Sequence, residues 1–202
     1  MIHDLAIQEA TFVVVDVETT GMSPIDDRIT ELAMMKVQGG VLRDEFSTLV
    51  NPLISIPNYV TELTGIDNLI VRDAPTAREV VPYMEEFLLN AIFVAHNVGF
   101  DWSFVYHTAR RERGLALSNP RLCTARLSRV ILPYLPSKSL GPVARFLDIN
   151  IHQRHRASGD AFATALVLVK YLSYLQKRYA IQTVEELLRY QEIIERVESP
   201  QT

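Results

Sequence analysis

Hydrophobic and polar positions fall into blocks that predict strands in the first part of the chain. The run TFVVVDVE, residues 11–18, is rich in β-branched and aromatic residues and predicts a strand. ITELAMMKV (29–37) and VLRDEFSTLV (41–50) flank Gly39 and Gly40, a glycine pair that favours a hairpin turn. We therefore expect three strands in meander order at the start of the fold.

Capping residues and apolar periodicity predict helices in the rest of the chain. A short helix is expected over 61–66, and a capping box at 76–79 predicts a second helix. The buried strand AIFVAH (91–96) leads into a helix that ends near Arg113. SLGPVARFL predicts another short helix, and Ser158 is the expected N-cap of a long helix through DAFATALVLVKYLSYLQKRY. Strands followed by alternating strands and helices indicate a mixed α/β sheet.

The last predicted helix covers 183–198 and has its own capping box at 183–186. Its apolar face can dock on its own domain, which we favour, or on a partner helix. No linker precedes about residue 180, so we expect a main domain over 1–180 and a C-terminal helical extension over 181–202.

Composition indicates an ordinary globular protein. The 202 residues are 48% hydrophobic and 22% charged, and a single cysteine, Cys123, excludes an intrachain disulfide. We expect Cys123 to be a small buried hydrophobe, and we expect a reducing, cytoplasmic location. The start MIHDLAIQEA has no pattern of a signal peptide, and Lys170 interrupts the apolar stretch ATALVLV, so no membrane contact is expected.

Charge is distributed unevenly along the chain. The net charge is −4, but residues 105–156 carry ten basic and two acidic side chains, a local charge of +8. Such a segment can face phosphates, or its charges can be solvated and paired within the fold. Charge alone does not separate these alternatives.

Two carboxylates at the end of the first strand are the first candidate site. Asp16 and Glu18 are two residues apart, so they point to the same face of the strand. Their repulsion calls for a cation or a shared proton, as in a glycosidase acid/base pair or a site for Mg²⁺ or Mn²⁺. The alternative is that both acids are simply exposed to solvent and have no catalytic or metal-binding role. Thr19 and Thr20 add hydroxyls, and Gly21 allows a turn.

Two further motifs place polar residues where a predicted strand ends and a helix begins. AHNVGFD puts His96 and Asn97 after a buried strand and Asp101 near a helix start. HRASGD puts Asp160 in the first turn of the long helix and His155 on the loop before it, where an imidazole can accept a proton from water. Structural alternatives are an acid stabilised by a helix dipole and a surface histidine in a basic loop.

One arrangement uses all of these groups. Asp16, Glu18, Asp101 and Asp160 would converge on two divalent ions about 4 Å apart, with His155 as general base. An unrelated hydrolase that used the first two acids alone would leave the other three residues without a role.

The three motifs DVETTG, HNVGFD and HRASGD resemble, in order and spacing, the DEDDh 3′→5′ exonuclease superfamily, which includes the proofreading epsilon subunit of bacterial DNA polymerase III. The resemblance covers roughly residues 8–178 and extends to IPNYVTELTGI and SLGPVARFLDI. A histidine stands five residues before the last acid, and in this the chain resembles the DEDDh branch of the superfamily rather than the branch that uses a tyrosine.

The resemblance implies an RNase H-like α/β fold, with a five-stranded mixed sheet flanked by helices on both faces. It also implies stepwise release of nucleoside monophosphates from a DNA 3′ end. By the family pattern, Asp16, Glu18 and Asp160 bind the first of two divalent cations, Mg²⁺ or Mn²⁺. Asp16 also bridges to the second cation, which Asp101 holds, and His155 and Glu18 are the catalytic pair.

The family pattern also implies a set of residues that contact the terminal nucleotide. They are Thr19, Thr20, Met22, Leu63 and Thr64. In the nearest polymerase-subunit pattern a histidine often stands at the Thr64 position, so this chain departs from the pattern there. Asn97 is expected near the site, Phe100 as packing or as a stacking surface, and His96 as a structural histidine.

The implied partners are DNA 3′ ends, single-stranded or frayed, and a DNA polymerase subunit. An RNA 3′-end trimming exonuclease is the alternative within the superfamily, because the motifs address the same phosphodiester and only contacts to the 2′-hydroxyl discriminate. A non-catalytic polymerase-associated binding module is the alternative from another class. It predicts a missing ligand or base, and none is missing here.

Overall fold

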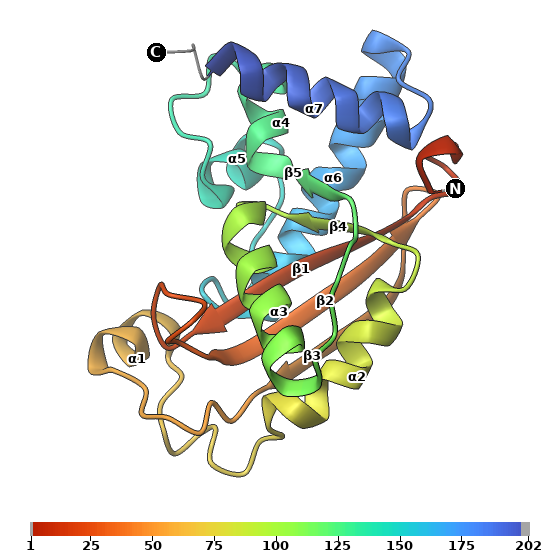
Figure 1. Ribbon diagram of the computed structural model, residues 1–202. Coiled ribbons are helices and arrows are strands. Elements are labelled where there is room, and N and C mark those ends of the chain that lie inside the picture. The colour runs from red at the N-terminus through yellow and green to blue at the C-terminus, as the bar shows by residue number, and fades with distance from the viewer. Residues whose placement is uncertain (1, 199–202) are drawn as a thin grey trace.

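The computed structural model describes residues 2–198, and it describes side chains as far as residue 193. Within this range five strands form one sheet in the order β3-β2-β1-β4-β5, with helices on both faces (Figure 1). The strands are β1 Thr11–Thr19, β2 Ile29–Gln38, β3 Val41–Leu49, β4 Ile92–Ala95 and β5 Arg121–Cys123. The helices are η1 Ile2–Asp4, α1 Asn58–Thr64, α2 Ala77–Leu88, α3 Val98–Arg113, α4 Thr124–Ile131, α5 Leu140–Phe146, α6 Ala157–Tyr179 and α7 Val184–Glu198.

The sheet is mixed because a hairpin meander precedes the crossover strands. β1, β2 and β3 pair antiparallel, whereas β4 runs parallel to β1 and to β5. Gly39 and Gly40 close the β2–β3 hairpin with φ of +62° and +72°, a conformation that glycine adopts without steric cost. The predicted meander and the predicted mixed α/β sheet are both confirmed.

Strand β1 contributes to the core on both faces of the sheet, because its side chains alternate between the two faces. Its even-numbered apolar residues pack with α6 and α7, and its odd-numbered ones pack with α2 and α3. By the same alternation, Asp16 and Glu18 lie on the α6 side, at the carboxyl end of the strand. The layer arrangement thus places two acids under the long helix.

Local capping signals predicted two helix starts correctly. The Thr76 backbone N–H donates to the Glu79 carboxylate at 2.8 Å where α2 begins. The Thr183 N–H donates to the Glu186 carboxylate at 3.0 Å where α7 begins. Both pairs are capping boxes, in which side chains three positions apart satisfy backbone groups that the helix leaves unpaired.

Two other helix starts were predicted wrongly. Helix α1 begins at Asn58, three residues earlier than expected, because the Pro57 carbonyl accepts its first hydrogen bonds. Ser158 does not cap α6, because it lies within the first turn. The Ala157 N–H instead donates to the carboxylate of Glu31 on β2, at 2.8 Å. A residue distant in sequence therefore supplies the cap.

Helix α7 docks on its own domain, which is the alternative that the sequence favoured. Val184 and Leu187 are fully buried in the α6-side core. The Gln191 side chain, only 6% exposed, accepts the Cys123 N–H at 2.6 Å and donates to the Arg121 carbonyl at 3.2 Å. The contact covers β5, a three-residue strand that the sequence pattern did not reveal, as it did not reveal α4.

The longest helix in the described chain, α6, spans 23 residues and includes the apolar stretch ATALVLV. Its buried side chains belong to the core beneath the sheet. Across residues 2–198, no helix combines the length and the hydropathy needed to cross a bilayer.

We predict that Gln191→Ala lowers the free energy of unfolding by about 1–3 kcal/mol, because it leaves a buried N–H and a buried carbonyl of β5 without partners. Urea titration followed by circular dichroism measures this loss. Gln8→Ala is the matched control, since Gln8 forms an exposed hydrogen bond to Gln176 and should change stability by less than about 0.5 kcal/mol. Equal losses in the two variants would contradict the assigned role of Gln191.

Candidate active site

Three carboxylates meet at the carboxyl end of β1. Asp16 and Glu18 come from the strand and Asp160 from the first turn of α6, and one oxygen atom of each lies within 4.8 Å of the others. All three side chains are partly buried. The strand and the helix thus bring together acids that are more than 140 residues apart in sequence, as the motif spacing suggested.

Asp101 joins this cluster from the other side of the sheet. It lies in the first turn of α3, is buried, and accepts the Val17 N–H at 3.2 Å. Val17 stands between Asp16 and Glu18 in β1, so this hydrogen bond holds the Asp101 carboxylate beside them. Asp101 lies outside the group of three acids whose oxygen atoms approach within 4.8 Å.

The carboxyl groups are held where ionisation is unfavourable. Burial, and then the charge of Asp101, raises the pKa of Asp16 well above its ordinary value. Burial and the charges of Asp160 and Glu31 raise the pKa of Glu18 to about 8. Burial also raises the pKa of Asp101 to about 7, although backbone N–H groups oppose the change. Burial is the main cause of all three shifts, and neighbouring negative charges add to it at Asp16 and Glu18.

The geometry and the chemistry of the cluster fit a hard divalent cation. Carboxylate oxygens are the ligands that Mg²⁺ and Mn²⁺ prefer. The Oδ1 atom of Asp160 is buried and has no hydrogen-bond partner among the described residues, so it has unused capacity to accept a ligand. Asp16, Glu18 and Asp160 would hold such an ion, with Asp101 adjacent.

The loop before α6 places His155 next to Asp160. The His155 backbone N–H donates to Asp160 Oδ2 at 3.2 Å. Burial raises the pKa of the Asp160 carboxyl, and this hydrogen bond partly opposes the change. His155 has φ of +63°, in the left-handed region that non-glycine residues rarely adopt. The loop folds tightly over α6, because a Cβ atom on Gly159 would lie 1.8 Å from the His152 carbonyl oxygen.

The two threonines of DVETTG are buried and bonded within their own loop. Thr19 Oγ1 donates to the Gly21 carbonyl at 2.6 Å. Thr20 Oγ1 donates to Asp27 at 3.0 Å and accepts the Arg28 N–H at 3.0 Å. Their hydroxyls therefore shape the loop that follows β1.

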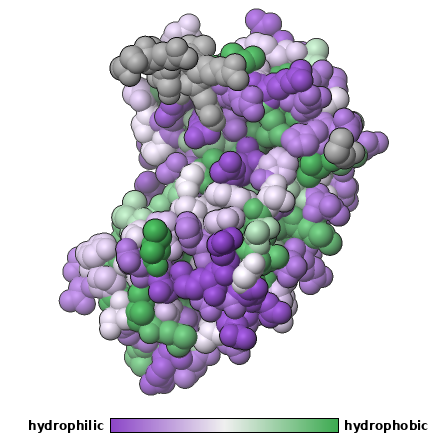
Figure 2. Space-filling model, viewed as in Figure 1, coloured by the Kyte–Doolittle hydropathy of each residue, from purple (hydrophilic) through white to green (hydrophobic). Residues whose placement is uncertain are grey.

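Hydrophobic side chains are exposed beside this loop and on α1. Met22 is 77% exposed and Leu63 is 58% exposed. Figure 2 shows hydrophobic patches on an otherwise mostly hydrophilic face, over the region where Figure 1 places α1 and the loop after β1. Thr64, by contrast, is buried, and its hydroxyl donates to the Val60 carbonyl and accepts the Ile66 N–H.

The residues of the second motif differ in exposure. Asn97 is exposed immediately before α3, and its carbonyl accepts the Phe100 N–H at 2.9 Å. The Phe100 ring is partly buried and packs on Phe104, with ring centroids 5.0 Å apart. His96 Nε2 lies 2.7 Å from the Lys138 carbonyl oxygen, and burial lowers its pKa, as expected of a structural histidine.

The sequence patterns did not indicate that an acidic residue, Glu31, and a basic residue, Arg156, form an ion pair next to the cluster. Glu31 is directly across from Glu18 in the β1–β2 ladder, and Arg156 binds it with an Nη2–Oε1 distance of 2.6 Å. The available signal was a charged residue in a strand whose other early positions are apolar or small. Only the three-dimensional structure reveals its partner.

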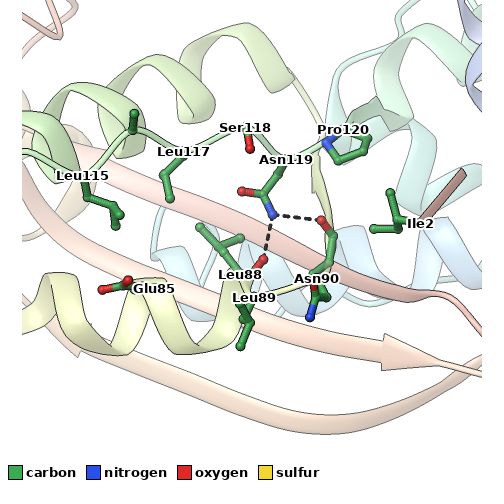
Figure 3. A pocket seen from close by; sticks show the side chains of 12 residues that line it. Ile2, Glu85, Leu88, Leu89, Asn90, Leu115, Leu117, Ser118, Asn119 and Pro120 are labelled. Carbon is green, nitrogen blue, oxygen red and sulfur yellow. Dashed lines mark hydrogen bonds between the residues drawn. The ribbon is translucent and has the colours of Figure 1, made fainter.

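A separate hollow lies at the amino end of β4. The acid cluster lies at the carboxyl end of β1, which runs parallel to β4, so the two sites are at opposite ends of these strands. It has a volume of ≈490 Å³, and Leu88, Leu89 and Leu117 are among the residues that line it (Figure 3). The Asn119 side chain donates to the Leu88 and Ala91 carbonyls at its wall. No carboxylate of the acid cluster lines this hollow.

Comparison with known proteins agrees with this geometry. The Exonuclease family profile matches residues 13–168. The DNA polymerase III subunit epsilon of Aquifex aeolicus (strain VF5) is 37% identical over 181 residues, which cover 90% of this chain and 90% of that protein. The PolC-type DNA polymerase III of Caldanaerobacter subterraneus subsp. tengcongensis is 42% identical over 179 residues. The match covers 89% of this chain and 13% of that protein, so the chain spans a small part of the PolC-type relatives.

Among solved structures, exonuclease X in complex with 5′-overhanging duplex DNA has a TM-score of 0.71 at 23% identity. The match covers 89% of this chain and 99% of that chain. At this identity the likeness shows the fold alone, and it confirms the expected RNase H-like arrangement of a five-stranded mixed sheet between helices.

We predict that the metal-free protein becomes less stable as the pH rises from about 4 to about 8. The pKa values of Asp101 and Glu18 in the folded protein, about 7 and about 8, exceed their ordinary values, so the folded state keeps protons that the unfolded chain has released. This contribution to stability is fully present below about pH 4 and is lost above about pH 8. Thermal unfolding in EDTA across this range measures the change.

Added Mn²⁺ should raise the melting temperature more at high pH than at low pH, because it binds the ionised carboxylates. Asp16→Asn should reduce both the loss with pH and the effect of Mn²⁺, since it removes one of the repelling charges. Asp44→Asn, on the exposed face of β3, is the matched control and should behave like the parent. An Asp16→Asn protein that responds to Mn²⁺ as the parent does would refute the assignment.

Proposed function

The chain belongs to the exonuclease family, and we propose that it is a metal-dependent 3′→5′ exonuclease of the DEDDh type acting on DNA. It releases nucleoside monophosphates from 3′ ends by phosphodiester hydrolysis, in proofreading or repair. The observation that carries the proposal is the convergence of Asp16, Glu18 and Asp160 within 4.8 Å, next to a histidine loop that is hydrogen-bonded to Asp160.

The acids divide between two cation positions. Asp16, Glu18 and Asp160 would hold the first ion. Asp16 and Asp101 would hold the second. Two divalent cations, Mg²⁺ or Mn²⁺, would supply positive charge to the scissile phosphate and make a water molecule more acidic when bound. The fixed positions of the acids, set by β1, α3 and α6, define where the phosphate can lie.

His155 and Glu18 act on the attacking water. An imidazole accepts a proton near neutral pH, and His155 is placed for this by its backbone bond to Asp160. Glu18 orients the water with its carboxylate from the strand end. The left-handed backbone at His155 presents the imidazole from a loop rather than from the helix itself.

The terminal nucleotide is bound by the loop after β1 and by α1. Met22 and Leu63 are exposed and offer apolar contacts to the base and sugar. Thr19, Thr20 and Thr64 act mainly by shaping this surface, because their hydroxyls are bonded within the protein. At the start of α3, the exposed Asn97 side chain contacts the nucleotide, and Phe100 supports the site through its packing.

DNA is favoured over RNA as the substrate, in the form of single-stranded or frayed 3′ ends. Relatives named as DNA polymerase III chains support this choice, and they also support a DNA polymerase subunit as partner. An RNA 3′-trimming activity is the alternative that the same acids would serve. A binding module without catalysis is disfavoured, because the four acids and the histidine are all present.

The organisation and location of the protein complete the proposal. Residues 1–180 form the exonuclease domain and 181–202 a helical extension, of which residues 199–202 lie outside the described part of the chain. A cytoplasmic location is in keeping with the single, buried cysteine.

We predict metal-dependent degradation of 3′-labelled single-stranded DNA and mismatched duplex DNA, faster than degradation of RNA. EDTA should stop the reaction, and Asp16→Ala should abolish it. His155→Ala should lower kcat by about 100-fold or more, because general base catalysis typically contributes that much, while Mn²⁺ binding persists. Gel analysis of labelled products and calorimetric Mn²⁺ titration provide the measurements.

His152→Ala is the matched control, because His152 is an exposed histidine of the same loop and should leave kcat unchanged. Degradation that continues in EDTA would refute the metal-dependent mechanism. Normal turnover by His155→Ala would remove His155 as the base, and faster degradation of RNA than of DNA would favour the alternative substrate.

A further inference from the structure

A further carboxylate, Glu31, lies on the same face of the sheet as the acid cluster. It is the direct neighbour of Glu18 in the β1–β2 ladder and is 3% exposed. Like charges directly opposite each other in a sheet are destabilising, and a buried charge is costly unless it is paired. Glu31 therefore requires compensation from elsewhere in the fold.

Arg156 and Ala157 provide that compensation. The Arg156 Nε atom lies 3.0 Å from Oε2 and 3.2 Å from Oε1 of Glu31, and Nη2 lies 2.6 Å from Oε1. The Ala157 N–H donates to Oε2 at 2.8 Å. Both carboxylate oxygens are thus engaged by a guanidinium fork and a helix N-terminus, which leaves Glu31 poorly suited to bind a metal ion itself.

These contacts fasten the segment that carries the catalytic groups. Arg156 and Ala157 stand between His155, on the loop, and Asp160, in the first turn of α6. The Asp160 N–H donates to the Arg156 carbonyl at 3.2 Å, so the fastened backbone continues directly into that acid. Strand β2 therefore sets the distance from the β1 acids to Asp160.

The loop on the other side of this attachment is strained. Gln153 and His155 both have left-handed φ values, +53° and +63°. The His152 carbonyl lies against Gly159, where any Cβ would collide with it. Such a loop keeps its shape only while both of its ends are held, and the ion pair with Glu31 holds the end that leads into α6.

We propose that Glu31 is a positioning residue of the metal centre, which acts through Arg156 and Ala157 to hold Asp160 and His155 in place opposite Asp16 and Glu18. This inference rests on the proposed exonuclease function. It adds a residue that belongs to neither the ligand set nor the nucleotide surface, and a specific role for the arginine in HRASGD.

Glu31→Gln tests the proposal, because glutamine keeps the shape and one acceptor but loses the charge. We expect kcat on single-stranded DNA and Mn²⁺ affinity to fall by about 10–100-fold, which is the usual cost of losing a residue that supports metal ligands from outside the ligand set. KM for the oligonucleotide should change by less than about threefold, since ground-state binding of DNA is untouched. Arg156→Lys keeps the positive charge but loses the two-pronged guanidinium contact. Its kcat and Mn²⁺ affinity should lie between those of Glu31→Gln and those of the parent.

Two controls separate positioning from general destabilisation. Gln191→Ala lowers stability at a distant helix and should keep kcat and Mn²⁺ affinity. Glu185→Gln makes the same chemical change in the exposed pair with Arg189, at 2.6 Å, and should have no effect. Circular dichroism establishes that each variant is folded.

Mn²⁺ titration requires no turnover, so it tests the role of Glu31 independently of activity. If the parent protein degrades none of the substrates, the proposed function is refuted, but the comparison of Mn²⁺ affinities still tests Glu31. If Glu31→Gln does not fold, Arg156→Lys decides alone. Values of kcat and Mn²⁺ affinity within about twofold of the parent in the folded variants would overturn the positioning role.

Discussion

The architecture depends on holding several carboxylates close together despite their mutual repulsion. Burial and neighbouring negative charge both oppose ionisation at the end of β1, as the raised pKa values of Asp16 and Glu18 reflect. A flexible chain would separate these groups. The protein keeps them together because each belongs to a rigid element whose opposite face is packed in the core.

The sheet solves this problem by drawing acids from both of its faces. Glu18 and Asp160 meet on the α6 side, whereas Asp101 reaches the cluster from α3 on the other side and is bound by a backbone N–H of β1. The central position of β1 makes this possible, because a central strand is covered on both faces. The ion pair of Glu31 with Arg156 then locks the helix that brings the third acid.

Much of this could be predicted from local sequence signals. The β1 run, the glycine hairpin and two capping boxes each depend on residues within a few positions of one another, and the motif spacing indicated the acid cluster. The rest depends on partners distant in sequence. The cap of α6 comes from Glu31, which is 125 residues before Arg156, so Ser158 was a reasonable but wrong choice. Strand β5 has three residues, too few for a periodic signal, and depends on Gln191 of α7.

The two edges of the sheet are protected in different ways. At one edge, β3 presents Arg43, Asp44 and Glu45 in succession, and charged side chains on an edge strand discourage pairing with another sheet. At the other edge, α7 covers β5 and its Gln191 occupies backbone groups that a foreign strand would need. The domain can therefore be carried inside a much longer polypeptide, next to other folding units, without joining its sheet to theirs.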